Sequence, residues 1–488
     1  METKCCLVFD VGKTNQKYFV FNSEDKILKR EKVNIPKVLD EDGHMAENIE
    51  GIIMWLRESF DFIMASNEFK IDKVSFSGFG ATLVHLDKNK KVITPVYDYH
   101  KPIEENTFKE FYIKYGPEST FSIQTGSRNL GMLNSGKQLY WIKYKRPHLF
   151  KKIRYTLHLP QYLSYVFTGE LHSEFTSIGC HTDLWDFEKN DYHNWIKSEG
   201  IDQLFPKIVH TSKTITKEIG GRRITFGIGI HDSSSALLTY LLKGKKSFLL
   251  LSTGTWCINF NPFSSTSLFE EKQIASGATA YMKIDGSPVK TSRLFLGEEH
   301  RMKVKILTKY FQVPKFHHRS LEFNEALYHE YIINSKNHFR WRYLDNSNAP
   351  VDDQLNFSSF EIAYHQLINE LMDLLKLKID IICETLPNII YIDGGFSDNS
   401  IFLALLKIQF PHQKIKAKPA SYACALGASM LLSKNSLVQT LSVCCNNAKL
   451  GTATNIDFGF IFSAIQNAVK LLPVPQGIII LPLSLDLK

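Results

Sequence analysis

The chain has 488 residues, of which 44% are hydrophobic and 22% are charged. This length is too great for a single hydrophobic core and suits two large domains, and the composition is that of a folded globular protein rather than a disordered one. Lys and Arg exceed Asp and Glu by 58 − 50 = 8, but the basic runs are short and scattered. The charge therefore does not favour a nucleic-acid partner.

The eight cysteines form no CxxC pair and no Cys/His zinc spacing. No apolar run approaches the roughly 20 residues that a membrane span needs. The first residues lead directly into a strand-like segment and show no secretory signal. We therefore expect a cytoplasmic protein with reduced cysteines and no membrane partner.

Two segments have the pattern of a β-hairpin closed by a glycine-containing turn. The first comprises Cys5–Phe9, the turn 10–15 and Tyr18–Phe21, and the second comprises Phe248–Leu251, the turn 252–255 and Trp256–Phe260. Gly12 is expected to supply unusual backbone angles in the first turn. The likeness suggests that the chain consists of two related halves, although such turns are common enough to occur twice by chance.

The rest of the chain alternates between the two hydrophobic periodicities. Helical spacing is found over Ile49–Ile63, Gln138–Tyr144, Leu159–Phe167, Ser234–Leu242, Phe360–Cys383 and Ala423–Leu432, and strand patterns over Ile71–Phe79, Ile224–Ile230 and Ile389–Ile392. This alternation predicts an α/β architecture. The polar run Lys243–Lys246 is the predicted domain boundary.

The first turn contains Gly12-Lys13-Thr14, which resembles the end of a Walker A motif. That motif also requires a glycine five residues before its second one and a following helix. Position 7 is Leu and a strand follows, so the Walker A interpretation is excluded. Inward-pointing amides can still make such a turn a phosphate site, and the turn 252–255 offers three hydroxyls for the same purpose. Taken alone, each is an ordinary polar turn.

Asp232 stands between an apolar strand and a helix of small residues. It is either the helix N-cap or a functional carboxylate at the strand end where α/β sheets place ligands. His231 either contacts a substrate hydroxyl or is a loop histidine. The adjacent glycines Gly394 and Gly395 indicate close ligand approach or a tight loop, and the small residues 425–428 indicate either a ligand or close helix packing.

These five segments, in this order, resemble the FGGY carbohydrate kinases over roughly residues 5–433. The resemblance implies an α/β, two-domain actin-like (ribonuclease-H-like) sugar kinase fold with the active site in the interdomain cleft. It implies a sugar- and phosphate-binding domain over residues 1–243 and a nucleotide-binding domain over residues 244–434. A tail of unassigned role, residues 435–488, would follow.

The resemblance also implies roles for individual residues. Asp232 would be the catalytic base, and Asp10 would help to position Mg²⁺. ATP would be bound by Gly12, Lys13, Thr14, Asn15, Lys17, Ser252, Thr253, Gly254, Thr255, Gly394, Gly395, Phe396, Asn399 and Gly427. The sugar would be bound by Ala81, Thr82, Tyr97, Asp98, His231 and Asp232.

Two departures from the family pattern affect this assignment. Lys13 stands where most members have Thr or Ser, which predicts an additional cation near the γ-phosphate. Residues 97–100 (Tyr-Asp-Tyr-His) replace the usual Trp followed by Asp and Arg, which leaves the sugar contacts open. The segments 229–232 and 251–256 are most similar to the rhamnulokinase and fuculokinase branch.

The implied function is transfer of the γ-phosphate of ATP to a primary hydroxyl of a sugar, a ketose such as L-rhamnulose, L-fuculose or a ketopentose. A non-catalytic sugar sensor on the same fold and an actin-like ATPase with a protein partner are the alternatives. The presence of Asp10, Asp232 and both turns favours the enzyme. The predicted partner is a small-molecule sugar, with neither nucleic acid nor membrane, and a homodimer is left open.

Overall fold

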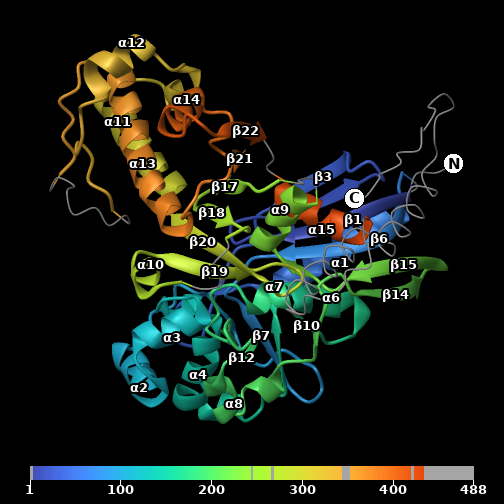
Figure 1. Ribbon diagram of the computed structural model, residues 1–488. Coiled ribbons are helices and arrows are strands. Elements are labelled where there is room, and N and C mark those ends of the chain that lie inside the picture. Colours follow the sequence, from blue (N-terminus) through green and yellow to red (C-terminus); the bar gives the residue numbers. More distant parts are fainter. Residues whose placement is uncertain are drawn as a thin grey trace, which may run out of the picture. The chain divides into compact units, whose positions relative to one another are not determined.

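The computed structural model describes residues 4–66, 68–242, 246–264, 269–342, 352–418 and 422–433. Within them lie two mixed β-sheets with helices on both faces (Figure 1). The predicted α/β class is confirmed.

The first sheet has the strand order β14-β15-β6-β1-β2-β3, and β16 also pairs with β6. Its strands are β1 (Lys4–Val11), β2 (Gln16–Phe21), β3 (Ile27–Val33), β6 (Lys70–Gly78), β14 (Thr214–Ile219), β15 (Arg222–Gly227) and β16 (Ile230–His231). The strand predicted over Ile224–Ile230 is interrupted at Gly229, whose φ is +92°. A Cβ there would lie 2.2 Å from the Pro160 carbonyl oxygen, so only glycine fits.

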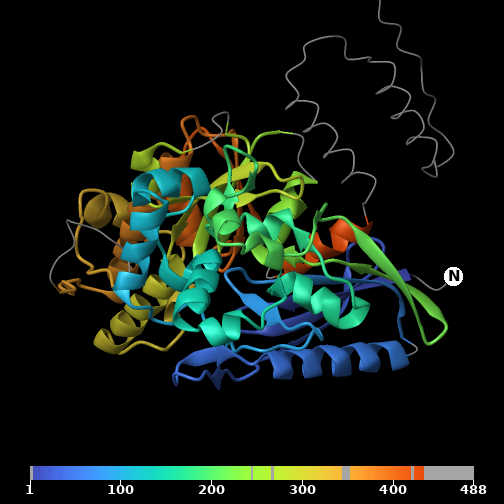
Figure 2. The same ribbon diagram turned by 90° about the horizontal axis from the view of Figure 1, so that it is seen from below.

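Strand β1 is buried on both faces, which explains why it is continuously apolar rather than alternating. Its odd-numbered residues pack against α1 (Ile49–Ala65) and α6 (Leu159–Thr168). Its even-numbered residues pack against α9 (Asp232–Leu241) and α15 (Ala423–Ser433). Figure 2 shows α1 lying along its face of the sheet. By this alternation Asp10 belongs to the face that α9 and α15 cover.

The second sheet has the order β19-β20-β18-β17-β21-β22. Its strands are β17 (Leu249–Thr253), β18 (Cys257–Asn261), β19 (Ala278–Met282), β20 (Pro288–Leu294), β21 (Ile389–Gly394) and β22 (Lys414–Lys418). Strand β17 pairs antiparallel with β18 and parallel with β21, as β1 pairs with β2 and β6. This shared topology agrees with the hypothesis of two related halves.

Helix α9 contacts both sheets. Leu238 belongs to the apolar cluster on the first sheet, whereas Leu237 and Tyr240 belong to a cluster on the second. The other face of the second sheet packs against α11 (Leu296–Tyr310), α13 (Phe360–Ile382) and α14 (Ser400–Gln409). Asp232, the first residue of α9, therefore begins the helix that lies between the two sheets.

The remaining short elements lie mostly between β6 and α9, and several of them pack around a third apolar cluster. The strands are β4 (Val38–Leu39), β5 (Met45–Glu47), β7 (Leu83–Leu86), β8 (Val96–Tyr97), β9 (Tyr155–His158), β10 (Ser173–Glu174), β11 (Trp185–Asp186), β12 (Asp191–Tyr192) and β13 (Ile208–Val209). The helices are α2 (Glu105–Tyr115), α3 (Glu118–Thr125), α4 (Ser135–Lys145), α5 (Pro147–Phe150), α7 (Phe175–Ile178) and α8 (Asn194–Ser198), with α10 (Glu271–Ala275) and α12 (Glu325–Leu327) later in the chain.

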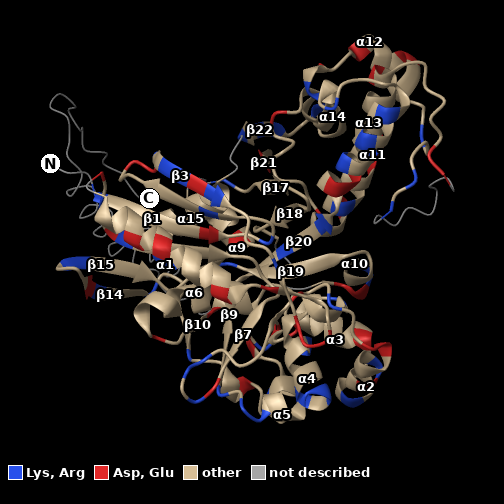
Figure 3. Ribbon diagram, turned by 180° about the vertical axis from the view of Figure 1, so that it is seen from behind, with Lys and Arg blue, Asp and Glu red and all other residues tan. Residues whose placement is uncertain are grey.

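The predicted domain limits stay predictions. Residues 243–245, at the predicted boundary, and the predicted tail 435–488 lie outside the described residues. Helix α15 comes from the predicted second domain but packs on β1, β2 and β6 of the first sheet. No helix in the described ranges is both long and apolar enough to span a membrane. Figure 3 shows basic and acidic residues interspersed along the same elements, α11 among them.

Candidate active site

The first turn, residues 12–15, is closed by a hydrogen bond from the Gly12 amide to the Asn15 carbonyl oxygen at 3.0 Å. The expectation of unusual angles at Gly12 is wrong, because its φ is not positive. Glycine is favoured there for another reason: a Cβ would lie 3.1 Å from the Asn15 oxygen. Thr14 is exposed, and its carbonyl oxygen accepts a hydrogen bond of 2.6 Å from Asn34.

The second turn is closed by the Gly254 amide, which donates to the Trp256 carbonyl oxygen at 2.8 Å. Gly254 and Thr255 are exposed, whereas Thr253 is buried. The amides of Gly395 and Phe396 donate to the Thr253 carbonyl and hydroxyl oxygens at 2.7 and 3.1 Å. The structure thus brings the second predicted phosphate turn against the predicted adenosine segment, about 140 residues away in sequence.

Gly394 makes this contact possible. Its φ is +82°, and a Cβ would lie 1.7 Å from the Thr253 carbonyl oxygen. A side chain at position 394 would therefore separate the strand from the turn. Of the two interpretations that the sequence left open, the tight loop describes the contacts that the structure shows.

Asp232 is the first residue of α9 rather than its N-cap, which is His231. Its Oδ1 accepts hydrogen bonds from the amide and hydroxyl of Ser233 at 2.5 and 3.1 Å. Among the described residues its Oδ2 accepts no hydrogen bond, and a quarter of the side chain is exposed. Burial raises the pKa of Asp232 to about 6. The group is thus a carboxylate near neutral pH with one oxygen available.

Asp10 and Lys17 lie beside this carboxylate. The two residues are register partners on β1 and β2, and Lys17 Nζ is 3.7 Å from Asp10 Oδ2. Burial raises the pKa of Asp10; Lys17 opposes the rise, and the negative charge of Asp232 adds to it. Two interacting carboxylates and one ammonium group therefore meet at the first turn.

This donor set fits Mg²⁺. Magnesium is usually held by one or two carboxylates, with water and phosphate oxygens as the remaining ligands. Within the described part of the chain no three His, Cys, Asp or Glu side chains form a metal cluster. Asp10 would thus supply few direct ligands to an ion bound with phosphate.

His231 is buried and held by its neighbours. Its Nε2 lies 3.2 Å from Cys180 Sγ and 3.4 Å from Asp232 Oδ1. A Cβ on Gly80 would lie 2.7 Å from this nitrogen, so glycine at position 80 makes room for the imidazole. Burial lowers the pKa of His231 to about 3, which leaves the ring neutral. A neutral ring can orient Asp232 but adds no positive charge.

Three of the predicted sugar ligands are buried and bonded to protein. Ala81 has a φ of +57°, which is unusual for alanine, and its carbonyl oxygen accepts from Gln138 at 2.8 Å. The hydroxyl of Thr82 donates to the Gly80 carbonyl oxygen at 3.2 Å. The hydroxyl of Tyr97 donates to Glu41 at 2.6 Å, and its ring packs in the third apolar cluster. Their roles in sugar binding stay predictions.

Lys13 has protein partners in the structure, and its expected place near the γ-phosphate stays a prediction. Its ammonium group lies 2.5 Å from Glu47 Oε1 and 3.1 Å from Asp98 Oδ2. It also lies 3.9 Å from the centroid of the Tyr99 ring. The structure therefore groups Lys13 with the predicted sugar loop that contains Asp98.

The predicted adenosine residues have structural partners of their own. The Phe396 ring packs against His300 at 5.1 Å, and Asn399 caps α14 through its side chain. A Cβ on Gly427 would lie 1.8 Å from the Ser235 carbonyl oxygen. Close packing of α15 on α9 therefore explains Gly427. The nucleotide-binding roles of these residues stay predictions.

Cys424, Asp393 and Arg293 were not among the predicted site residues. Burial raises the pKa of Cys424, and the charges of Asp10, Asp232 and Asp393 add to the rise. Asp393 is the penultimate residue of the apolar strand β21, and this position could have identified it from the sequence. Arg293 lies over the Trp256 ring at 5.4 Å and interacts electrostatically with Tyr99 and Tyr281, and no motif marks it.

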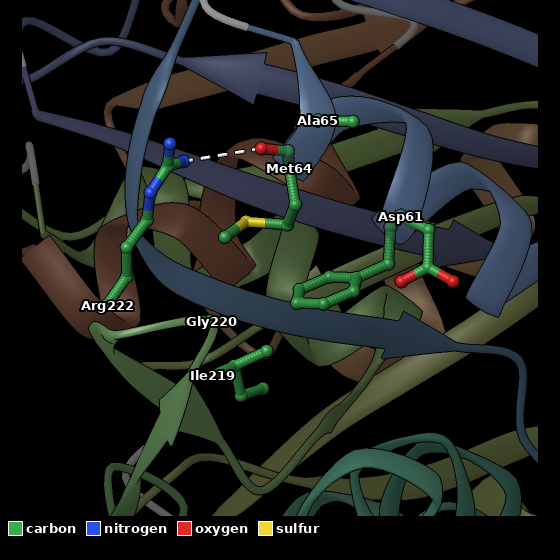
Figure 4. Close-up of a pocket in the computed structure, with 7 residues that line it drawn as sticks. Asp61, Met64, Ala65, Ile219, Gly220 and Arg222 are labelled. Atoms are coloured by element: carbon green, nitrogen blue, oxygen red, sulfur yellow. Dashed lines mark hydrogen bonds between the residues drawn. The ribbon is translucent and has the colours of Figure 1, made fainter.

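The pocket in Figure 4 belongs to another part of the first sheet. It is lined by Phe60, Asp61, Met64 and Ala65 of α1 and by Ile219, Gly220 and Arg222 of the β14–β15 hairpin. Arg222 donates to the Met64 carbonyl oxygen at 3.3 Å. None of the predicted site residues lines it.

Residues 5–238 match the N-terminal domain of the FGGY family of carbohydrate kinases. Over this part the chain is similar to the FGGY carbohydrate kinases, in agreement with the resemblance found in the sequence.

Among curated proteins, the chain is similar to the rhamnulokinase of Oceanobacillus iheyensis (21% identity, covering 57% of this chain and 61% of that protein). It is also similar to the rhamnulokinase of Halalkalibacterium halodurans (22% identity, covering 52% and 55%). The matched segments thus span little more than half the length of these relatives.

Similar solved structures cover more of the chain than these curated relatives do. A carbohydrate kinase from Novosphingobium aromaticivorans has a TM-score of 0.70 at 23% identity, covering 88% of this chain and 93% of that one. The xylulose kinase of Rhodospirillum rubrum has a TM-score of 0.73 at 13% identity, covering 88% and 89%. These likenesses show the fold, the two-domain actin-like architecture that the sequence predicted.

Proposed function

We propose that the protein is an ATP-dependent carbohydrate kinase in which Asp232 is the general base. It transfers the γ-phosphate of ATP to a primary hydroxyl of a sugar. The observation that carries this proposal is the state of Asp232, at the start of the helix between the two sheets. It is a carboxylate with a pKa of about 6, and one of its oxygens has no hydrogen-bond partner among the residues that the structure describes. A base with a pKa near the working pH is suited to proton abstraction.

The residues around Asp232 support this chemistry. Asp232 Oδ2 accepts the proton of the attacking hydroxyl, while Ser233 fixes Oδ1 and so orients the carboxylate. Lys17 keeps positive charge beside Asp10. Bound Mg²⁺ would neutralise phosphate charge, with Asp10 on its protein side. The amides and hydroxyls of the two turns would hold the phosphate chain in line with the acceptor.

The acceptor is proposed to be a ketose. The curated relatives are rhamnulokinases, and the motifs around Asp232 and the second turn resemble the same branch. L-Rhamnulose, L-fuculose and ketopentoses are therefore the first candidates. A cytoplasmic location is part of the same proposal.

The test is an ADP-release assay with Mg-ATP across a panel of ketoses, aldoses, sugar acids and polyols. We expect one ketose to stimulate ADP release well above the background without sugar. Asp232→Asn keeps the size and the Ser233 contacts, and should lower kcat by on the order of 10³-fold while ATP binding persists.

Other outcomes decide between the alternatives. Near-normal turnover by Asp232→Asn would contradict the role of Asp232. ATP binding with no stimulation by any sugar would favour the non-catalytic sensor, and rapid ATP turnover that needs no sugar would favour an ATPase with a protein partner.

A further inference from the structure

Lys13, Lys37, Glu47 and Asp98 form a compact group, here called the Lys13 cluster. Lys13 Nζ lies 2.5 Å from Glu47 and 3.1 Å from Asp98. Lys37 Nζ lies 3.5 Å from Glu47 and also pairs with Asp98. Two ammonium groups therefore meet two carboxylates, and the formal charge of the cluster is zero.

The carboxylates of the cluster are almost completely removed from solvent. The side chains of Glu47 and Asp98 are each 5% exposed, against 18% for Lys13 and 30% for Lys37. Hydrogen bonding with His100 and the ammonium of Lys13 hold the pKa of Asp98 well below its usual range, although burial opposes them. Burying four charges costs desolvation free energy, which the attraction between the charges offsets only in part. Stability alone is therefore a weak reason for the cluster.

The cluster connects four separate segments. Lys13 comes from the β1–β2 turn, Lys37 from the residues before β4, Glu47 from the end of β5, and Asp98 follows β8. Among these, the β1–β2 turn is the first predicted phosphate turn, and residues 97–98 are predicted sugar ligands. The cluster thus ties the phosphate side of the site to the sugar side.

Lys13 also lies near Phe79, which precedes the predicted sugar ligands Ala81 and Thr82. Its ammonium lies 5.2 Å from the Phe79 ring, immediately before residues 80–82, and the Phe79 amide donates to the Val11 carbonyl oxygen at 3.1 Å. On the other side the same ammonium covers the Tyr99 ring at 3.9 Å. Burial raises the pKa of Tyr99, and the charges of Asp98, Asp232 and Glu47 add to the rise.

We propose that Lys13 is a positioning residue for the sugar acceptor and not a phosphate ligand. By pairing with Asp98 and covering Tyr99, it fixes the loop 97–100 against the first turn. Acceptor affinity then depends on Lys13, whereas ATP affinity does not. This inference rests on the proposed kinase function.

The test compares Lys13→Met with Lys303→Met. Methionine keeps an unbranched side chain over the rings but removes the charge. Lys303 is a matched control, because its ammonium also pairs with a carboxylate (Asp353, 2.7 Å) and lies near an aromatic ring (Trp341, 5.9 Å), outside the site. We expect Lys13→Met to raise the KM for the acceptor about tenfold or more, with the KM for ATP within about twofold. Lys303→Met should change neither constant.

Glu47→Gln provides a second variant that leaves the first turn untouched. It removes one carboxylate from two ammonium groups, so it should raise the KM for the acceptor in the same direction as Lys13→Met. Because the two residues act through one cluster, the double variant should raise it no more than about the larger single effect. Lys13→Arg, which keeps the charge, should recover part of the acceptor affinity.

Different results would contradict the Lys13 proposal and the kinase proposal. A rise in the KM for ATP with an unchanged KM for the acceptor would make Lys13 a phosphate ligand and overturn the proposal. Unchanged constants in both Lys13→Met and Glu47→Gln would also overturn it. If Lys13→Met does not fold, Glu47→Gln and Lys13→Arg carry the test. Absence of sugar-stimulated turnover in the wild-type protein would contradict the kinase proposal itself, before any variant is measured.

Discussion

The two sheets carry the same pair of polar residues in exchanged positions. In the first sheet Asp10 on β1 faces Ser77 on the parallel strand β6. In the second sheet Ser252 on β17 faces Asp393 on the parallel strand β21. In both pairs burial raises the pKa of the carboxyl group and the serine hydroxyl opposes the rise.

The exchange gives the two turns different chemistry. In the first sheet the carboxylate lies on the strand that enters the turn, with Lys17 as its register partner on the strand that leaves it. In the second sheet the register partner of Ser252 is Ile258, and the carboxylate of Asp393 accepts from Tyr240 at 3.2 Å. One strand topology thus supports a charged turn in one half and a neutral turn in the other.

The largest difference between the two halves is expected in kcat, when the carboxylates of Asp10 and Asp393 are replaced in turn. Asp10→Asn removes the negative charge beside Asp232 and Lys17, and should lower kcat by on the order of 10²-fold or more. Asp393→Asn should lower it by less than about tenfold, since Asp393 already has a protein partner in Tyr240. The measurement is steady-state kinetics with Mg-ATP and the stimulating sugar. Equal losses in both variants would mean that the halves are not specialised in this way.

The next largest effect is expected at two glycines, Gly78 after Ser77 and Gly394 after Asp393. Gly394→Ala places a Cβ 1.7 Å from the Thr253 carbonyl oxygen at a positive φ, and should lower the free energy of unfolding by roughly 3 kcal/mol or more. Gly78→Ala should cost about 1 kcal/mol, since its nearest neighbour is a proline side-chain carbon at 3.2 Å. Urea unfolding of both variants measures the difference. Similar costs would contradict the contact between Gly394 and the second turn.

A smaller effect follows from the raised pKa of Asp393. Burial raises it to about 6, so the folded protein binds this proton more tightly than the unfolded chain. The contribution of Asp393 to the free energy of unfolding therefore falls as pH rises from about 4 to 6 and stays low above that. Asp393→Asn removes this dependence. The difference in Tm, variant minus wild type, should therefore be more positive at pH 8 than at pH 4.5. The same difference at both pH values would contradict the raised pKa.

The smallest effects are expected at the exposed hydroxyls of the two turns. Thr14→Ala and Thr255→Ala each remove one donor without filling or emptying the core. Each should raise the KM for ATP by about two- to fivefold and change the free energy of unfolding by less than about 0.5 kcal/mol. A change in the KM for the sugar instead would place that turn on the acceptor side.

Much of the fold could be predicted from the sequence, because its central strands and helices have strong periodic patterns. The helix predicted over Leu159–Phe167 was found over Leu159–Thr168, ended by Gly169 in the left-handed conformation. The strand predicted over Ile224–Ile230 failed at Gly229, where the cause is the close approach of Pro160. That approach is a tertiary contact, which no local pattern contains.

The sequence identified site residues that lie at or near the ends of strands. It did not identify contacts that are made through long side chains. Asp10 lies near the end of β1 and Asp232 directly follows β16, and the charge of Asp232 acts on Asp10 in the structure. Lys13 adjoins a predicted phosphate turn, but its long side chain reaches Glu47, 34 residues away. Arg293 reaches the same region from the second sheet, without a motif. Side-chain direction and partner, unlike strand position, could not be deduced from spacing.

The central claim is that Asp232 acts as the general base, and the pH dependence of kcat/KM for the sugar tests it most directly. The base must be deprotonated, so kcat/KM should rise with a slope of one below an apparent pKa of about 6 and level off above it. The profile is measured from about pH 5 to 8 at saturating Mg-ATP. A value of kcat/KM that is constant across this range, or that falls as pH rises through 6, would contradict the account.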